Sequence, residues 1–408
     1  MAGRIRPASL IGCDPGKKVH VRRRPVPPFS SGSSCSLDLP MEVSAVWGSE
    51  EPLMITTNKL MDLLQVKLPI VQAPMAGVAT PAMAAAVSNA GALGSLGLCA
   101  SSPEAARQAV EEVQQQTTAP FNVNFFCHAK PQRDPTIEAA WIQRMVPLFA
   151  RFEAEPPTEL RDIYTSFRDT DAYLDLLLEL RPSVVSFHLG LPRPDQIDEL
   201  RGAGLVLIGS ATSRAEARAI EAAGFHAVIA QGWEAGGHRG IFDPAGPDER
   251  LSTSDLLQVL LDEVRIPVIA AGGIMDGHDI CGMLDQGAAA VQLGTAFIGC
   301  PESAADAGYR DRLALGGDTV MTQAISGRPA RCLGNALTQW AEDIDPVTIP
   351  AYPYAYDLAK ALNTAAKAKG ATAFGAQWAG AQAARARALP AGELVEALAR
   401  EMKACATA

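Results

Sequence analysis

The sequence predicts an α/β protein with the architecture of a (β/α)8 barrel. From about residue 54 onward, short apolar runs rich in β-branched residues alternate with helical patterns, and eight such runs can be distinguished. This alternation is typical of parallel βα units, whose strands are buried on both faces. Glycines and polar residues follow most of the runs directly, at the strand ends where barrel enzymes carry their active sites.

A doubly wound open sheet is the alternative fold. In that fold the first strand normally leads into a glycine-rich G-x-G-x-x-G turn. Here the first strand is followed by Ala-Pro-Met-Ala-Gly at residues 73–77, which does not match that pattern. The barrel is therefore the preferred interpretation.

The predicted strands are short continuous apolar runs, as expected of strands that are buried on both faces. In chain order they cover Pro69–Ala73, Ala92–Leu96, Phe121–Phe126, Ser183–His188, Leu205–Ser210, Ala227–Gln231, Pro267–Ala271 and Ala290–Leu293.

Helix signals separate these strands. Thr80 and Ser102 are typical N-cap residues, and each is followed by a proline at the first helical position. The helices that they begin are expected to end near Gly91 and Gln116, and a further helical pattern covers Arg214–Ala223. The connection after the third strand, residues 127–182, is an unusually long insert. It is predicted to be helical over Ile137–Phe152 and Asp171–Leu180.

Three regions follow from these patterns. Residues 1–53 are rich in Pro, Ser and Arg, show no apolar period and lack the apolar core of a secretory signal, so we expect a disordered extension. Residues 54–300 form the predicted barrel, including the helical insert 127–182. Residues 301–408 are rich in alanine and are predicted to form a C-terminal helical segment that covers the active site at the barrel mouth.

Composition excludes several classes of function. The chain has 408 residues and a net charge of −10, which argues against a nucleic-acid partner. No apolar run approaches the roughly 18 residues that a membrane span needs. The eight cysteines are spaced singly, without a C-x-x-C pair, so we expect no metal site and a reduced, cytoplasmic protein.

The chain is organised around the loop at residues 230–240, which follows the sixth predicted strand. Its paired glycines Gly236 and Gly237 allow a flat ligand to approach the backbone closely. His238 lies on the same loop, where an imidazole can exchange a proton near neutral pH. The alternative is an ordinary glycine turn with a solvated His-Arg pair.

The last two strands end in sequences suited to a phosphate group. Gly272-Gly273 follows the seventh strand and Gly294-Thr295 follows the eighth, which is where barrels often bind phosphate. Amide side chains at other strand ends, those of Asn124 and Gln231, suit the edge of a flavin ring. They could instead satisfy backbone groups at those strand ends.

Taken together, these motifs resemble the nitronate monooxygenase family, formerly called 2-nitropropane dioxygenases, and its class I members in particular. The resemblance extends from about residue 60 to residue 360. It rests on Ala-Pro-Met-Ala-Gly at 73–77, Asn-Val-Asn-Phe-Phe at 122–126, Ser-Phe-His at 186–188, the loop 231–240, Ala-Gly-Gly-Ile at 271–274 and Gln-Leu-Gly-Thr-Ala-Phe at 292–297. It implies an FMN-dependent oxidation of alkyl nitronates, such as propionate 3-nitronate, by O2 to a carbonyl compound and nitrite or related nitrogen species.

The resemblance also assigns roles to residues. His238 would be the catalytic histidine. The substrate side would comprise His188, Tyr164, Tyr352, Tyr356 and Lys360. FMN would be held by Ala73, Pro74, Met75, Asn124, Gln231, Gly236, Gly273, Gln292, Leu293, Gly294 and Thr295. His128, just after the third strand, is a further candidate for reaching the pocket.

Other functions remain open at this level. The main alternative is an FMN-dependent NAD(P)H reductase on the same scaffold, acting on an enoyl thioester or a quinone, because such enzymes also carry a Gly-Gly-His loop. A non-catalytic FMN-binding protein and a flavin-free barrel enzyme, such as a phosphosugar isomerase, are weaker alternatives. The sequence does not decide between a monomer and a homodimer.

Overall fold

The computed structural model describes residues 59–405. The predicted disordered extension, residues 1–53, lies outside this range. Among the residues described, no helix has both the length and the apolar character needed to cross a membrane.

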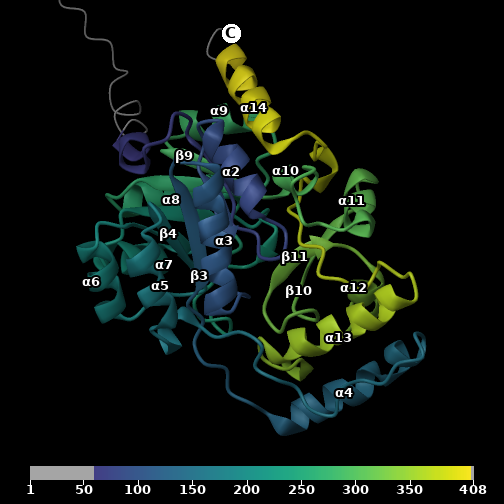
Figure 1. Cartoon of the computed structure of the whole chain (residues 1–408). Coiled ribbons are helices and arrows are strands. Elements are labelled where there is room, and N and C mark those ends of the chain that lie inside the picture. The colour runs from purple at the N-terminus through teal and green to yellow at the C-terminus, as the bar shows by residue number, and fades with distance from the viewer. Residues whose placement is uncertain (1–58, 406–408) are drawn as a thin grey trace, which may run out of the picture. The chain divides into compact units, whose positions relative to one another are not determined.

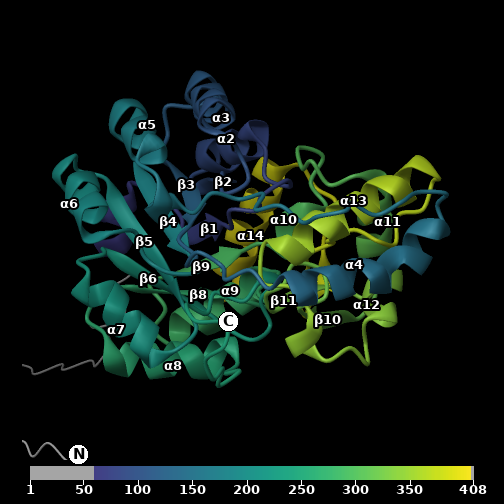
Figure 2. The same ribbon diagram turned by 90° about the horizontal axis from the view of Figure 1, so that it is seen from below.

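Eight parallel strands form the central sheet, in the spatial order β1-β9-β8-β6-β5-β4-β3-β2 (Figure 2). The two end strands meet through a parallel bridge between Val71 and Leu93, which closes the sheet into a barrel. The predicted fold class is therefore confirmed. The strands are β1 (Ile70–Gln72), β2 (Gly94–Gly97), β3 (Phe121–Phe126), β4 (Val184–His188), β5 (Val206–Ala211), β6 (Ala227–Gln231), β8 (Val268–Ala271) and β9 (Ala290–Leu293).

The barrel interior is filled by branched apolar side chains, as is usual in this fold. Val184, Ile208 and Ile269 from three different strands belong to one buried cluster. Leu60 and Leu64, which precede β1, pack into the same cluster and are almost completely buried. The core of the barrel therefore includes side chains from residues before the first strand.

An outer layer of helices surrounds the strands (Figures 1 and 2). The predicted caps are confirmed: Thr80 Oγ1 accepts the backbone N–H of Met83, and Ser102 Oγ accepts that of Ala105. The outer helices are α2 (Pro81–Asn89), α3 (Pro103–Gln116), α5 (Ala172–Leu180), α6 (Pro194–Gly202), α7 (Arg214–Ala222), α8 (Thr253–Glu263), α9 (Gly277–Asp285) and α14 (Ala391–Cys405).

Helix α14 takes the place of the eighth outer helix, since it packs against both α9 and α2. The expectation that all of residues 301–408 cover the active site is therefore wrong for this helix. Similarly, α5 packs against α3 and α6 and belongs to the barrel wall rather than to an extra insert.

The remaining elements gather on one side of the barrel (Figure 2). Helix α4 of the insert packs against α13 around a second apolar core that includes Trp141 and Leu358. A small antiparallel sheet, in the order β10-β11-β7, also forms here. These elements are α4 (Pro135–Ala150), β7 (Gly237–His238), α10 (Thr295–Ile298), α11 (Ala307–Ala314), β10 (Thr319–Thr322), β11 (Ala330–Leu333), α12 (Ala336–Trp340) and α13 (Tyr354–Ala368).

The prediction that residues 301–408 are helical is thus wrong at β10 and β11. Each of these strands is only four residues long, and β11 pairs with β7, which lies in the loop after the sixth barrel strand. This pairing joins the segment beyond the barrel to the loop that carries His238.

Candidate active site

A cavity of about 430 Å³ lies at the C-terminal ends of the barrel strands, between them and helix α13. The predicted catalytic, substrate-side and cofactor residues all line this cavity, with the exception of Leu293. The side chain of Leu293 is buried in the hydrophobic core, and only its backbone carbonyl reaches towards the site, where it accepts the N–H of Ala73 at 2.8 Å. The resemblance implied that Leu293 helps to hold FMN, and that role stays a prediction.

Glycines allow four loops to meet at one end of the cavity. A Cβ at Gly236 would lie 2.6 Å from the backbone of Ala379, and one at Gly272 would lie 2.6 Å from Thr253 Oγ1. Both Gly272 and Gly273 have positive φ, which favours glycine. The loop after β6 therefore approaches segment 379–380, and the loop after β8 approaches Thr253, more closely than residues with side chains would permit.

Hydrogen bonds fix these loops relative to one another. Glu234 accepts the backbone N–H of Thr253 at 2.8 Å. The Thr253 hydroxyl lies 2.9 Å from a carboxylate oxygen of Glu234 and 2.9 Å from the carbonyl of Gly272, and its single proton is donated to one of the two at a time. Thr295 Oγ1 accepts the N–H of Gly380 at 2.9 Å. The geometry here is set by backbone and short side chains, which is typical of phosphate cradles.

The side chain of Gln231 hydrogen-bonds to the backbone of the loop that follows it. Its Nε2 donates to the carbonyl of His238 at 3.0 Å, and its Oε1 accepts the N–H of Gly240 at 2.7 Å. Of the two roles considered for Asn124 and Gln231, Gln231 has the second, which is to hydrogen-bond to backbone groups at its strand end. Asn124 likewise donates to Ser186, at 2.9 Å to the hydroxyl.

Gln292 differs from these two amides. Its Oε1 is buried, lines the cavity, and has no hydrogen-bond partner among residues 59–405. This acceptor is therefore available to a ligand.

His238 is held by its backbone. It pairs with Ala330 across β7 and β11, and its carbonyl accepts hydrogen bonds from Gln231 and from His188 Nε2, the latter at 3.1 Å. A carbonyl can only accept, so His188 carries its proton on Nε2. His188 therefore serves to position the His238 backbone.

The imidazole of His238 is buried, and its Nε2 makes no hydrogen bond within the described part of the chain. Aromatic rings surround it: the centroids of Trp378, Tyr352 and Phe126 lie 5.1, 5.4 and 5.9 Å away. Burial, and then the Arg328 guanidinium, lower the pKa of His238 to about 3. The imidazole is thus neutral near pH 7 and has a nitrogen available to a ligand.

The predicted substrate-side residues form a second wall. Lys360 Nζ lies 2.8 Å from the hydroxyl of Tyr164, and 5.1 and 5.4 Å from the ring centroids of Tyr164 and Tyr356. Tyr356 and Lys360 are one turn apart on α13 and so share a face of the helix. The hydroxyl of Tyr352 is buried without a partner among the residues that the structure describes. A cation and phenol groups therefore face the cavity together.

Several residues of the site were not predicted from the sequence. Asn363 and Gln377 line the cavity, and each has a buried side-chain oxygen with no partner in the described range. Trp378 contributes the ring whose centroid is closest to that of His238 among its ring contacts. Their segment lies far beyond the barrel strands in sequence, and no local motif marks it. His128 does not line the cavity, although its ring contacts that of Tyr352 at 5.1 Å.

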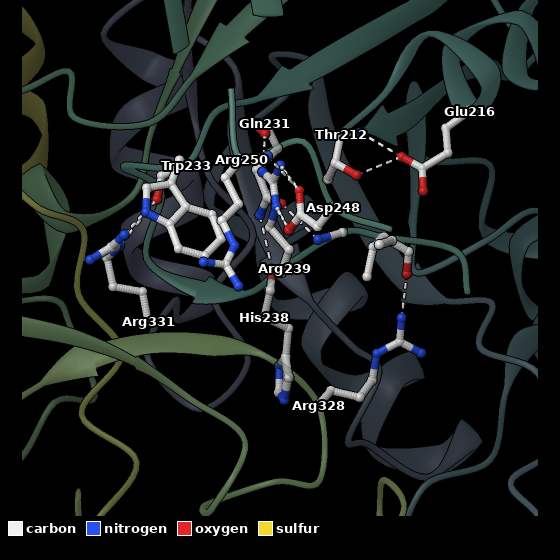
Figure 3. Close-up of polar contacts among 12 residues, drawn as sticks. Thr212, Glu216, Gln231, Trp233, His238, Arg239, Asp248, Arg250, Arg328 and Arg331 are labelled. Atoms are coloured by element: carbon white, nitrogen blue, oxygen red, sulfur yellow. Dashed lines mark hydrogen bonds and ion pairs between the residues drawn. The ribbon is translucent and has the colours of Figure 1, made fainter. Parts of the chain in front are cut away.

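Two buried arginine side chains hydrogen-bond to the backbone on either side of His238 (Figure 3). The side chain of Arg239 is 1% exposed, binds both carboxylate oxygens of Asp248 at 2.9 Å, and donates to the carbonyl of Gln231. Arg328 donates to the carbonyl of Ile241. The sequence Gly-Gly-His-Arg-Gly at residues 236–240 thus contains a structural arginine as well as the candidate catalytic histidine.

Comparison with known proteins gives consistent results. A family profile described as nitronate monooxygenase matches residues 57–401. A nitronate monooxygenase from Paraburkholderia phytofirmans is 52% identical over 347 residues, which are 84% of this chain and 94% of that protein. The solved structure of a nitroalkane oxidase from Streptomyces ansochromogenes is 40% identical, with a TM-score of 0.78, and covers 85% of this chain and 99% of its own. FabK from Thermotoga maritima is 31% identical with a TM-score of 0.66, over 86% of this chain and 97% of its own.

Proposed function

Because this chain belongs to the nitronate monooxygenase family, we propose that it oxidises alkyl nitronates, such as propionate 3-nitronate, with O2 and with FMN as its cofactor. The products would be the carbonyl compound and nitrite or a related nitrogen oxide. The observation that carries the proposal is the cavity at the barrel mouth, where buried unpartnered polar atoms and a glycine cradle converge.

The residues present fit a flavin in two respects. Leaving a buried acceptor such as Gln292 Oε1 without a partner costs roughly 1–3 kcal/mol, and a flavin ring edge offers N–H groups that can satisfy it. The close loop approach at Gly236, Gly272 and Gly273 supplies backbone N–H groups of the kind that bind phosphate. This one phosphate-sized site, without a second fingerprint for an adenosine half, favours FMN over FAD.

The proposed cofactor residues lie on several strand ends. They are Ala73, Pro74, Met75, Asn124, Gly236, Gly273, Gln292, Gly294 and Thr295. Gln231 and the backbone of Leu293 would support the site indirectly. When bound, FMN supplies the electron transfer from substrate to O2, which none of these side chains can carry out.

The second wall of the cavity suits an anionic substrate. A nitronate carries its negative charge on the nitro oxygens, and the Lys360 ammonium beside the Tyr164 hydroxyl offers a cation and a hydrogen-bond donor together. The Tyr352 hydroxyl has a proton to donate and a buried setting in which such bonds are strong. These groups would orient the nitronate within the cavity.

His238 would have a different task. A nitronate arrives without its α-proton, so its oxidation requires no base. A neutral nitroalkane must first lose that proton, and the neutral imidazole of His238, whose Nε2 has no partner among residues 59–405, is positioned to accept it. The same site can therefore serve both substrate forms with different demands on this residue.

The test is an aerobic assay of the yellow protein with propionate 3-nitronate, following O2 consumption and nitrite release, combined with mass spectrometry of the released cofactor. We expect turnover with the nitronate and a mass corresponding to FMN. NADH is the control substrate, because the NAD(P)H reductase is the main alternative function and the chain is similar to FabK. NADH oxidation without nitronate turnover would contradict the proposal, and release of FAD would contradict its cofactor.

A further inference from the structure

Two thiols meet on the outside of the barrel, away from the cavity. Cys281 lies on α9 and Cys405 at the end of α14. Each sulfur atom contacts the backbone of the helix that carries the other cysteine. Cys281 Sγ contacts the carbonyl of Met402 on α14 at 3.6 Å, and Cys405 Sγ contacts the carbonyl of Gly277 on α9 at 3.9 Å.

This pair differs from the other cysteines in residues 59–405. Cys99, Cys127, Cys300 and Cys332 are buried, whereas Cys281 and Cys405 are partly exposed to solvent. An oxidant can therefore reach both of these thiols. Because each sulfur atom contacts the helix that carries the other thiol, the packed α9–α14 interface brings the two thiols close together.

We infer that Cys281 and Cys405 form a reversible intrachain disulfide when the protein meets a peroxide, and that this bond fastens α14 to α9. One thiol reduces H2O2 to water and becomes a sulfenic acid. The second thiol attacks that sulfur and displaces its oxygen as a second water molecule, which completes the S–S bond. Two thiols are thereby oxidised by two electrons, and one H2O2 is reduced to two waters.

The bond would act on a structurally important contact. Glu401 on α14 accepts the N–H of Gly277 at 2.8 Å and pairs with Arg387, which also donates to the carbonyl of Met275. Met275 lies in the connection between β8 and α9, two residues after Gly273, and Gly277 is the first residue of α9. A disulfide that fixes α14 to α9 would therefore stabilise the connection between β8 and α9, which begins with Gly272 and Gly273 at the cavity. The inference itself does not depend on the proposed function.

The experiment treats the full chain with a small excess of H2O2, blocks remaining thiols with N-ethylmaleimide, and maps unreduced tryptic peptides by mass spectrometry. We expect one cross-linked peptide pair containing Cys281 and Cys405, which disappears on reduction. The melting temperature of the oxidised protein should rise by roughly 5 °C, because the cross-link restricts the unfolded chain over a long loop. Cys405→Ser should show neither the cross-link nor the rise. A Cys13→Ser/Cys35→Ser background removes the two cysteines of the N-terminal extension and should behave like the unmodified chain.

Three outcomes would overturn the inference. Cys281 and Cys405 could both remain open to N-ethylmaleimide after oxidation, or both become over-oxidised without a cross-link. The cross-link could join two chains, visible as a dimer on a non-reducing gel. Finally, a cross-link that lowers the melting temperature would show that the two thiols must leave their native positions to react.

Discussion

His238 has a fixed backbone and an available side chain, and this contrast defines its role. Gln231, His188 and the strand partner Ala330 hold its main chain, while its Nε2 has no partner among residues 59–405. A group placed by three supports, with one reactive atom left unused, is the usual arrangement of a pre-organised proton acceptor.

The first prediction concerns His238→Asn. Turnover of neutral nitroalkanes should fall by about 10²-fold or more, the usual contribution of a positioned base. Turnover of a preformed nitronate should fall much less, since no α-proton has to be removed. Steady-state kinetics with both substrate forms, at matched flavin content, measure the difference.

His278→Asn is the matched control, because His278 is exposed on α9 and outside the cavity. It should leave both activities unchanged. Equal losses on both substrates for His238→Asn, mainly in KM, would instead assign His238 to binding of the anionic group.

The residues of the site were largely predictable because strand ends are marked in the sequence. Glycines and amides after apolar runs point to one edge of the barrel, and all the predicted residues but Leu293 line the cavity there. What the sequence did not reveal is how an amide is used. Gln231 and Gln292 both end barrel strands, yet one is saturated by its own loop and the other has an unpartnered oxygen.

At the scale of elements, the regular strands were predicted and the short ones were missed. β3, β6 and β9 have the predicted bounds, because each is a short run made up mostly of apolar residues. β2 begins two residues later than predicted, since Leu93 forms only the closing bridge with β1. β10 and β11 carry no such signal, and their pairing with a two-residue strand in a distant loop is a tertiary effect.

The second prediction tests the loop junction through Gly236→Ala. The added Cβ would lie 2.6 Å from the backbone of Ala379 and Gly380, which cannot yield as a flexible side chain would. The loops must separate, so the variant should purify with much less bound flavin and rebind it more weakly. Absorbance of the purified protein and titration with FMN measure this.

Gly202→Ala is the matched control for that substitution. Gly202 ends α6 on the outer layer, and a Cβ there meets nothing within 4 Å. It should retain full flavin content and an unchanged or slightly raised melting temperature. Normal flavin binding by Gly236→Ala would show that the close approach of these loops is not needed for the cofactor.

At the scale of the whole molecule, buried histidines link stability to pH. Burial lowers the pKa of His128 and of His188 to about 4 and that of His238 to about 3, whereas an unfolded histidine titrates near 6.5. Between these values the unfolded chain binds more protons than the folded chain, so stability falls as the pH falls below 6.5.

The third prediction is that the free energy of unfolding is lower at pH 5 than at pH 7. At pH 5 each of the three groups destabilises the fold by at most about 2 kcal/mol relative to pH 7. Urea unfolding of the flavin-free protein should therefore give a free energy of unfolding several kcal/mol lower at pH 5, with little change between pH 7 and pH 8. Equal stability at pH 5 and pH 7 would mean that these histidines are not held neutral.

The last prediction separates the N-terminal extension from the barrel. Residues 1–53 show no apolar period, so their removal should expose no core, and a chain beginning at Met54 should keep its flavin and its melting temperature. A chain beginning at Val66 also lacks Leu60 and Leu64, which pack against Ile208 and Ile269 inside the barrel. Losing each buried leucine costs about 2–5 kcal/mol. The second chain should therefore melt many degrees lower or fail to fold, as differential scanning calorimetry of both will show, whereas a drop of several degrees in the first would mean that the extension packs on the barrel.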